Sequence, residues 1–325
     1  KFLSHEKKED VEIIRIPQHG FTFYRIPSPS RFLAELKKVD IVHIHGINAW
    51  MDVACGLKPF HSAKIIVNTH GGFFHTPQRK GIKWVYEKTL FRLSKGNVDF
   101  FIADSASDAA RLSDVPLTKK IIIPNGINPL FQKAFSIRRT GFESIFIGRI
   151  SKNKRLDHLI SAFTSVVSII PSAKLHIVGP DWEGLGESLN ERVHTEGLAK
   201  NILFHGSIPD ENVVELLARS RLFVSASEYE GFGISVLEGM SAGCIPLLND
   251  IPTFREFGGE GRGKWVSFSN PTDAGKEWVS LLRESPAQQT DRRKKGKTYA
   301  ALFSGSSVTK NILGVYQKIL GEHSS

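Results

Sequence analysis

Short apolar runs alternate with longer stretches of helical periodicity along most of this 325-residue chain. Runs rich in Val, Ile, Leu and Phe predict strands, and apolar residues that recur every third or fourth position predict amphipathic helices. The predicted strands are Val11–Ile16, Ile41–His45, Ile65–Thr69, Phe100–Asp104, Lys120–Pro124, Ser144–Gly148, Lys174–Val178, Ile202–His205, Leu222–Ser225, Ile245–Leu248 and Trp265–Phe268. The predicted helices are Arg31–Lys38, Ala49–Lys58, Lys80–Leu93, Ser105–Leu112, Leu156–Ile169, Leu185–Thr195, Glu211–Ala218, Ile234–Ser241, Ala274–Arg283 and Ser306–Leu320.

Strands that are apolar on both faces and are separated by helices indicate parallel sheets covered on both sides. Pro129, a basic cluster and Gly141 interrupt the alternation and predict a linker. The sequence therefore predicts an α/β fold with two Rossmann-like doubly wound domains, 1–134 and 135–305, and a C-terminal helix in 306–325 that packs back on the first domain. In such tandem sheets, ligands bind in the cleft lined by the carboxyl ends of the strands.

Composition restricts the class of protein further. Hydrophobic residues make up 41% and charged residues 23% of the chain, proportions that are typical of a globular protein and argue against disorder. No apolar run approaches the roughly 20 residues that span a bilayer. Cys55 and Cys244 both lie in apolar stretches, so we expect reduced core residues and neither a disulfide nor a metal site.

The formal net charge of +10 favours an anionic partner: nucleic acid, a phosphate-bearing small molecule or an acidic membrane surface. The basic residues are spread along the chain and form no recognised nucleic-acid-binding module, so nucleic acid is not expected as a partner. One stretch, Arg79 to Leu93, mixes Lys and Arg with aromatic residues at helical spacing and suits an anionic membrane. The residues expected to contact the membrane or acceptor are Arg79, Lys80, Lys83 and Trp84. An ordinary helix that packs its apolar side on the core is the alternative.

A glycine and two basic residues stand at the end of the predicted strand Ser144–Gly148 and in the loop after it. Gly148 lets the backbone approach a ligand closely. Arg149 and Lys154 can converge on a diphosphate, one as a planar fork and the other as a point charge. The same residues are also compatible with a solvated basic loop.

Two carboxylates, Glu230 and Glu238, flank a glycine-rich turn between a predicted strand and a predicted helix. Gly231 and Gly233 free the N–H groups at the start of the helix, which is a ready anion site. One carboxylate can therefore reach a sugar and the other a ribose, with phosphates held between them. A capped helix with two surface acids is the alternative, but the position after the fourth strand of the domain, in one cleft with the basic loop, favours a binding site.

The loop Asn68–Thr76 follows a predicted strand of the first domain and contains the pair Gly71-Gly72. His70, at the end of that strand, is predicted to meet the reacting sugar across the cleft, although a lone histidine at a strand end is more often structural. His75 is the weaker candidate of the two. Two further stretches, Pro124–Asn128 and Ala103–Ser105, stand at strand ends. Asn125-Gly126 is primarily a turn signal, so a structural role is expected, with a contact in the cleft as the alternative.

The second domain resembles glycosyltransferase family 4 with the GT-B fold, and the resemblance is carried by Gly148-Arg149, Lys154, Val178-Gly179, Gly206, Glu230 with Glu238, and Ser241–Pro246. The matching stretches of the first domain are Thr69-His70-Gly71 and Pro124-Asn125-Gly126. Family members open with a strand and a glycine-rich loop that this chain does not show before Val11–Ile16, so the first domain is expected to lack its first strand. The resemblance implies a retaining glycosyltransferase with an interdomain cleft.

Within the family, the finer resemblance is to bacterial mannosyltransferases of xanthan- and acetan-type exopolysaccharide assembly, through His70–Thr76, Ser105, Lys154, Glu230 and Glu238. It implies transfer of mannose from GDP-mannose to a cellobiosyl-diphosphate polyprenol with an α-1,3 linkage. A cytoplasmic protein held peripherally on the inner face of the bacterial plasma membrane would meet such an acceptor. A UDP-linked donor, a different acceptor, a sugar-nucleotide epimerase and a non-catalytic sugar-binding protein are the alternatives.

The resemblance also implies roles for the candidate residues. The residues expected to take part in transfer are His70, Arg149, Lys154 and Glu230, and those expected to bind the nucleotide sugar are Ser105, Gly148, Gly206, Phe232, Gly233, Ile234 and Glu238. Glu230 would bind the donor sugar, Glu238 the ribose hydroxyls, and the cationic side chains the leaving diphosphate. No Asp-x-Asp motif occurs, so a metal-independent reaction without a cofactor is expected. Same-face attack and a covalent intermediate both remain open as routes to retention.

Overall fold

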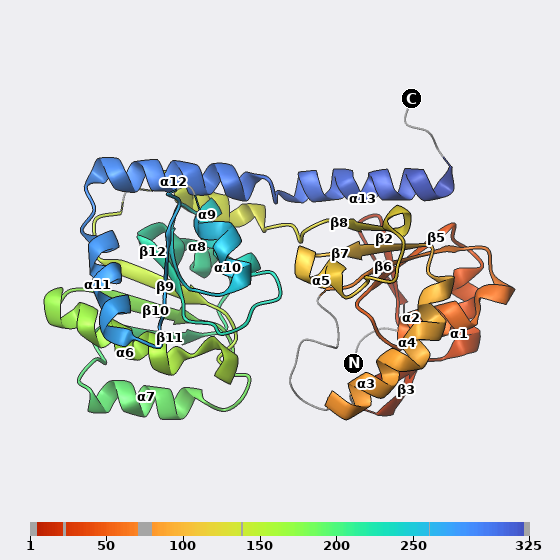
Figure 1. The fold of residues 1–325 in the computed structure, drawn as a ribbon, viewed down its shortest axis with the longest axis horizontal. Coiled ribbons are helices and arrows are strands. Elements are labelled where there is room, and N and C mark those ends of the chain that lie inside the picture. The colour runs from red at the N-terminus through yellow and green to blue at the C-terminus, as the bar shows by residue number, and fades with distance from the viewer. Residues whose placement is uncertain (1–4, 22–23, 71–79, 138, 260, 322–325) are drawn as a thin grey trace. The chain divides into compact units, whose positions relative to one another are not determined.

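The computed structural model describes residues 5–21, 24–70, 80–137, 139–259 and 261–321. The chain forms two compact units, the first from Lys1–Pro124 with Thr309–Ser325 and the second from Asn125–Val308 (Figure 1). Each unit contains a parallel sheet that helices cover, which confirms the predicted α/β architecture. The sequence places the boundary after residue 134, whereas the units divide before Asn125, because the 3₁₀ segment η5 (Pro129–Ser136) packs on helices of the second unit.

The described residues of the first unit form a four-stranded parallel sheet in the order β5-β6-β7-β8. Its strands are β5 (Ile41–His45), β6 (Lys64–Asn68), β7 (Phe100–Ala103) and β8 (Lys120–Ile122), and the helices of this unit include α1 (Pro29–Leu36), α2 (Ala49–Gly56), α3 (Lys80–Lys88), α4 (Leu90–Ser94) and α5 (Ala106–Ala110). Helices α1, α2 and α4 cover one face, where the buried side chains include Phe32, Met51, Ile65, Phe91 and Phe101.

The opposite face of this sheet is covered by the C-terminal part of α13 (Gly305–Leu320), which belongs to the first unit from Thr309 on. The Tyr316 hydroxyl and His43 Nδ1 form a hydrogen bond of 2.7 Å, and the Lys318 ammonium lies 5.0 Å from the centre of the Phe100 ring. Since side chains alternate along a strand, His43 and Phe100 point away from the face that α2 covers.

Two antiparallel hairpins precede the parallel sheet and correct the prediction for the N-terminal region. They pair β1 (His5–Lys8) with β2 (Val11–Ile14) and β3 (Gln18–Phe21) with β4 (Tyr24–Pro27). The predicted strand Val11–Ile16 therefore lies outside the parallel sheet, because a two-residue turn with Glu9 at φ 54° folds it back on β1. The predicted helix Lys80–Leu93 is two helices, interrupted at Thr89, whose hydroxyl donates a 2.6 Å hydrogen bond to the carbonyl of Val85.

The second unit contains a parallel sheet in the order β11-β10-β9-β12-β13-β14. Its strands are β9 (Glu143–Ile147), β10 (Lys174–Val178), β11 (Ile202–Gly206), β12 (Leu222–Ser225), β13 (Ile245–Asn249) and β14 (Lys264–Val266). Its helices include α6 (Leu156–Ile169), α7 (Gly186–Thr195), α8 (Asp210–Arg219), α9 (Ile234–Ser241), α10 (Pro252–Gly258), α11 (Pro271–Leu282) and α12 (Pro286–Ala301). Every strand predicted for this region is present, with ends that differ by at most a few residues.

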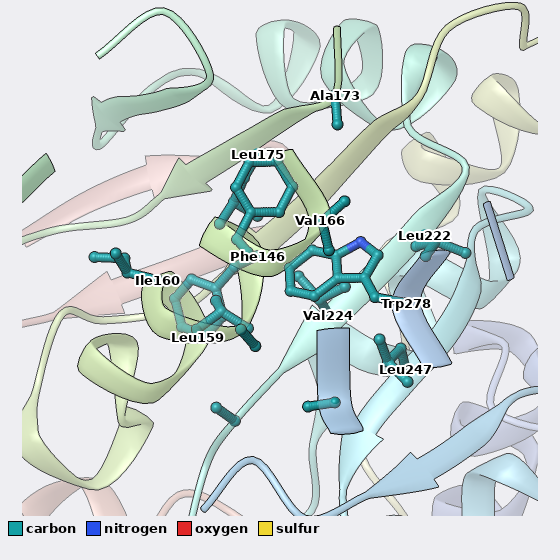
Figure 2. Packing of buried hydrophobic residues seen from close by; sticks show 14 of the residues in the cluster. Phe146, Leu159, Ile160, Val166, Ala173, Leu175, Leu222, Val224, Leu247 and Trp278 are labelled. Atoms are coloured by element: carbon teal, nitrogen blue, oxygen red, sulfur yellow. The ribbon is translucent and has the colours of Figure 1, made fainter. Parts of the chain in front are cut away.

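Each face of this second sheet carries its own core. On one face, α6 and α11 pack on Phe146 and Leu175, and Trp278 of α11 is fully buried among them (Figure 2). The Trp278 indole N–H donates a 2.9 Å hydrogen bond to the Ser144 hydroxyl, which satisfies its one polar atom. On the other face, the side chains buried by α8, α9, α10 and α12 include Leu217, Met240, Phe254 and Ala300.

Helix α12 lies in a region where the sequence analysis predicts no helix. It exposes most of its length and buries Gly296 and Ala300, so it lacks the apolar stripe by which helices are recognised. Its start is nevertheless encoded locally: Ser285 accepts a hydrogen bond from the backbone N–H of Gln288, and the Gln288 side chain accepts one from the N–H of Ser285. This reciprocal capping box, followed by Pro286 at the first helical position, is a recognisable start signal.

Glycines end or follow the three strands β9, β10 and β11 at the carboxyl edge of the second sheet. The N–H of Gly148 donates to the carbonyl of Val178, and the N–H of Gly179 donates to the carbonyl of Gly206, so the hydrogen-bond ladder continues to the strand ends. A Cβ atom on Gly179 would lie 2.1 Å from the carbonyl oxygen of Gly148, and Gly179 has a φ of 137°. Only glycine fits this position.

We predict that Gly179→Ala destabilises the protein by more than about 3 kcal/mol, since it combines a left-handed backbone with a backbone clash. The matched control is Gly197→Ala, because Gly197 also has a positive φ, 72°, but open space around its Cα. The control should cost about 1 kcal/mol. Denaturant unfolding followed by circular dichroism measures both values, and equal losses would contradict the close packing at Gly179.

Candidate functional site

The predicted phosphate loop follows β9 in the second unit. The Arg149 guanidinium lies 5.0 Å from the centre of the Trp182 ring, which holds it by a cation–π contact. Lys154 ends the 3₁₀ turn η6 (Lys152–Lys154), and its ammonium lies 2.5 Å from Oε1 of Glu230. The two side chains of this pair are only 12% and 16% exposed. The ammonium that is predicted to contact the diphosphate and the carboxylate that is predicted to contact the sugar therefore neutralise each other directly.

Backbone and side-chain contacts join the two loops that carry this ion pair. The N–H of Glu228 donates to the carbonyl of Asn153 at 2.9 Å, and the Asn153 side chain donates to the carbonyl of Tyr229 at 3.2 Å. Arg155, in the left-handed conformation at φ 46°, forms an ion pair with Glu228. The loop after β9 and the loop after β12 are therefore one structural unit, and Lys154 and Glu230 are held together before any ligand binds.

The start of α9 presents backbone N–H donors. Gly233 is its N-cap at φ 81° and offers no side-chain acceptor to the first-turn N–H groups. The Phe232 ring packs edge-on against Phe257 and Phe303, with centroids 6.1 and 5.7 Å away, so this residue contributes its backbone and not its ring to the turn. The Ile234 side chain is 37% exposed. A helix start of this kind suits an anion.

Glu238 lies on α9 and faces the chain segment that opens the second unit. Its Oε1 accepts a 3.2 Å hydrogen bond from the backbone N–H of Asn128, whose side chain in turn donates to Asp210 at 2.9 Å. Burial, aided by the charge of Asp210 and opposed by the hydrogen bond from Asn128, raises the pKa of Glu238 to about 7. The sequence singles out Glu238 and predicts a turn, with a cleft contact as the alternative, at Pro124–Asn128, but the contact between Glu238 and Asn128 comes from the structure alone.

In the first unit, His70 lies directly after β6 with a strained φ of 46°. Its Nδ1 lies 3.0 Å from Oδ2 of Asp104, and its Nε2 lies 2.7 Å from Nδ1 of His45. The hydrogen bond to Asp104 raises the pKa of His70, whereas burial and the neighbouring His70 lower the pKa of His45. Asp104 thus fixes the orientation of the His70 ring and favours its charged form.

The order of strands in the first sheet places His45 and Asp104 on either side of His70. β5, β6 and β7 are adjacent parallel strands, and His45, His70 and Asp104 stand at or just after their carboxyl ends. The sequence analysis assigns a role to His70 alone, although strand-end position was the signal for all three. Ser105, predicted to bind nucleotide sugar, caps α5, where its hydroxyl accepts a 3.2 Å hydrogen bond from the N–H of Asp108.

Some of the remaining candidate residues lie within the described part of the chain and others lie outside it. Gly206 ends β11 at φ 63° beside Gly179. Arg79 and His75 lie outside the described residues, and Lys80 and Lys83 are described only as backbone of α3. Trp84 on the same helix is 62% exposed, so it does not belong to the core. Within the described part of the chain, every helix is too short or too polar to cross a bilayer.

Known proteins match this chain over nearly its whole length. The family described as "Glycosyl transferases group 1" matches residues 129–300, and the family described as "Glycosyltransferase Family 4" matches residues 4–130. A GDP-mannose:cellobiosyl-diphosphopolyprenol alpha-mannosyltransferase of Xanthomonas campestris is 30% identical over 98% of this chain and 83% of its own length. A protein of the same name from Komagataeibacter xylinus is 26% identical over 96% of this chain and 79% of its own length.

A solved structure shares the fold. The sucrose-phosphate synthase of Thermosynechococcus elongatus superimposes with a TM-score of 0.76 at 18% identity, covering 99% of this chain and 87% of its own. At that identity the likeness concerns the arrangement of helices and strands alone. It agrees with the two units, each with a parallel sheet, described above.

We predict that Glu238→Gln changes the pH dependence of stability. The carboxyl has a pKa of about 7 in the folded protein against 4.5 ordinarily, so its stabilising contribution is present at low pH and is lost as the pH rises from about 4.5 to 7. Glutamine does not titrate. The variant should therefore gain about 1–2 kcal/mol relative to the wild type between pH 5 and pH 8, after allowance for partial solvent screening. Urea unfolding at both pH values measures the difference, and a constant offset would contradict the raised pKa.

Proposed function

This chain belongs to glycosyltransferase family 4 and has the GT-B fold, and on that premise we propose that it transfers mannose from GDP-mannose to a polyprenyl-diphosphate-linked oligosaccharide. The family makes it a hexosyltransferase. The choice of donor and acceptor is supported by the names of the relatives that match along the chain. The observation that carries the chemistry is the buried Lys154–Glu230 pair. Arg149 precedes Lys154 in the same loop, and the N-cap of α9, Gly233, offers no side-chain acceptor to the first-turn N–H groups.

The departing nucleotide develops negative charge on its terminal phosphate. Lys154, Arg149 and the N–H groups at the start of α9 would stabilise that charge as it builds, and such donors accelerate transfer because they act more strongly on the transition state than on the bound donor. Glu230 would accept hydrogen bonds from the sugar hydroxyls, and Glu238 from the ribose hydroxyls. His70, oriented by Asp104, would position or stabilise the transferred sugar.

We assign retention of configuration to same-face attack. The acceptor oxygen would bond to the anomeric carbon while the bond to the leaving phosphate breaks, and the acceptor proton would pass to that phosphate. The alternative requires a carboxylate nucleophile. Glu230 is the carboxylate of this loop that we place at the donor sugar, and its short contact with the Lys154 ammonium lowers the nucleophilicity of the oxygen that would have to attack.

We further propose that the reaction needs no metal and takes place at the cytoplasmic face of a bacterial plasma membrane, in exopolysaccharide assembly. Cationic side chains and a helix start would balance the diphosphate charge that a metal balances elsewhere. The exposed Trp84 on the basic helix α3 supports attachment to an anionic surface.

The proposed activity is tested with labelled GDP-mannose and a cellobiosyl-diphosphate polyprenol in detergent. We expect mannose to appear in the lipid-linked product, with UDP-glucose as the inactive donor control. Excess EDTA should leave the initial rate unchanged. Transfer from UDP-glucose in preference to GDP-mannose would contradict the donor assignment, and a rate that EDTA abolishes and Mg²⁺ restores would contradict metal independence.

We predict that Lys154→Ala lowers kcat on the order of a hundredfold or more, with a smaller rise in KM for the donor, because the ammonium acts on charge that develops in the transition state. Lys154→Arg should recover only part of the rate, because the planar guanidinium group of arginine does not match the compact ammonium group of lysine in shape. The control is Lys152→Ala, which removes an exposed charge from the same turn and should keep the wild-type rate.

Loss of Lys154 also leaves Glu230 without its cation, so a second comparison separates the two effects. Glu230→Gln keeps the shape and removes the charge, and it should lower kcat more than Glu238→Gln does. Steady-state kinetics on variants with wild-type circular dichroism spectra decide both points. Near wild-type turnover of Lys154→Ala would mean that the diphosphate is held by other residues.

A further inference from the structure

The first unit contains a cavity of about 950 Å³ that no step above uses. Its walls come from the start of α2, from the β3–β4 hairpin and from α3 with the first residue of α4. The side chains that line it are mostly apolar, and they include Ile47, Trp50, Ile82, Val85 and Leu90. This volume lies at the upper end of the range for small-molecule pockets.

One buried carboxylate connects two walls of this cavity through hydrogen bonds and fixes the distance between them. Asp52 of α2 accepts hydrogen bonds from the hydroxyls of Tyr24 at 2.7 Å and Tyr86 at 2.8 Å, and from the hydroxyl of Ser94 at 2.5 Å. Tyr24 lies on the hairpin wall and Tyr86 on the helix wall. Their hydroxyls are satisfied by Asp52, so the rings present carbon to the cavity, which is therefore formed before a ligand enters.

Several apolar side chains around this cavity are exposed. Ile82 is 51% exposed, Val85 is 52% exposed and Leu90 is 39% exposed. Filling the cavity with an apolar ligand would remove this surface from water, at about 25 cal/mol for each square ångström. The polar groups at the cavity are few, and Arg25 is the cation among its described lining residues.

The charges around the cavity point to the kind of apolar ligand. Arg25 lines the cavity, and no carboxylate is among the lining residues that the structure describes. An occupant with a long hydrocarbon chain and an anionic head would satisfy both the apolar walls and this cation. A polyprenyl diphosphate has this chemistry, whereas an apolar peptide lacks the anionic head.

We infer that this cavity binds the first isoprene units of the lipid-linked acceptor, with Arg25 beside the diphosphate. The inference rests on the proposed function for the identity of the acceptor. In this inference, the cavity makes the enzyme prefer acceptors with a long polyprenyl chain. General attachment to the membrane is a separate property, which Trp84 and the basic residues of α3 would provide. The enzyme would thus recognise the lipid as well as the sugar.

The test compares two acceptors that share the sugar and diphosphate, one with a long polyprenyl chain in detergent and one with a hexyl chain. The wild type should prefer the polyprenyl acceptor in kcat/KM by about tenfold or more. Val85→Asp and, as a second variant, Ile82→Asp should reduce this ratio towards one, because they should lower kcat/KM more for the polyprenyl acceptor than for the hexyl acceptor, which fills less of the cavity. Both positions are half exposed, so folding should tolerate the change.

The matched control is Leu93→Asp, which adds the same charge to a side chain that is 75% exposed on α4 and does not line the cavity. It should keep the wild-type ratio. An equal loss in Leu93→Asp would assign the preference to the membrane and overturn the inference, as would an unchanged ratio in both cavity variants. Self-association that Val85→Asp abolishes, with no change in lipid preference, would make a second copy of the chain the occupant.

A direct binding measurement separates failure of the inference from failure of the proposed function. Polyprenyl monophosphate is titrated into the protein while intrinsic tryptophan fluorescence is followed, since Trp50 lies in the cavity wall. A saturable change in the wild type that Val85→Asp abolishes would support the cavity even if no mannose is transferred. A fluorescence response that is equal in both proteins would exclude the cavity as the lipid site even if transfer occurs.

Discussion

The backbone of Gly179 packs so closely on the carbonyl of Gly148 that a side chain has no room between β9 and β10 at the carboxyl edge of the second sheet. Since Gly148 and Gly179 also continue the hydrogen-bond ladder to Val178 and Gly206, the loops beyond this edge begin from a rigid rim. Arg149 is the first side chain after that rim. Its position on Trp182 is thus set by close backbone packing, and so is the start of the turn that carries Lys154.

The Lys154–Glu230 pair adds electrostatic order to this rim. An ammonium and a carboxylate that are both largely buried would each be costly alone, and their pairing offsets part of that cost. The pair therefore holds the proposed phosphate-binding group and the proposed sugar-binding group at one fixed separation. A nucleotide sugar brings negative phosphate to the cation and hydroxyl donors to the anion, so it can satisfy both members without separating them.

In the first unit, two carboxylates organise two different surfaces. Asp104 orients His70 and raises its pKa at the carboxyl ends of β5, β6 and β7. Asp52 receives three hydroxyl donors and fixes the walls of the apolar cavity. The first arrangement provides a polarised imidazole, and the second provides a preformed cavity with largely apolar walls. Under the proposed function, the first would act on the sugar and the second on the lipid of the acceptor.

The sequence by itself determined the parallel α/β architecture, because apolar runs and helical periodicity are local properties of neighbouring residues. It also located the loops that carry Arg149, Glu230 and His70, since ligands bind after the carboxyl ends of parallel strands. Only the tertiary structure decided that Lys154 pairs with Glu230, which lies 76 positions away, and that Glu238 meets Asn128. The same holds for the cavity around Asp52. The polar helix α12 differs, because its capping box is a local signal although it lacks an apolar stripe. The contacts of Lys154, Glu238 and Asp52 depend on how distant segments meet in space, and local periodicity does not encode that meeting.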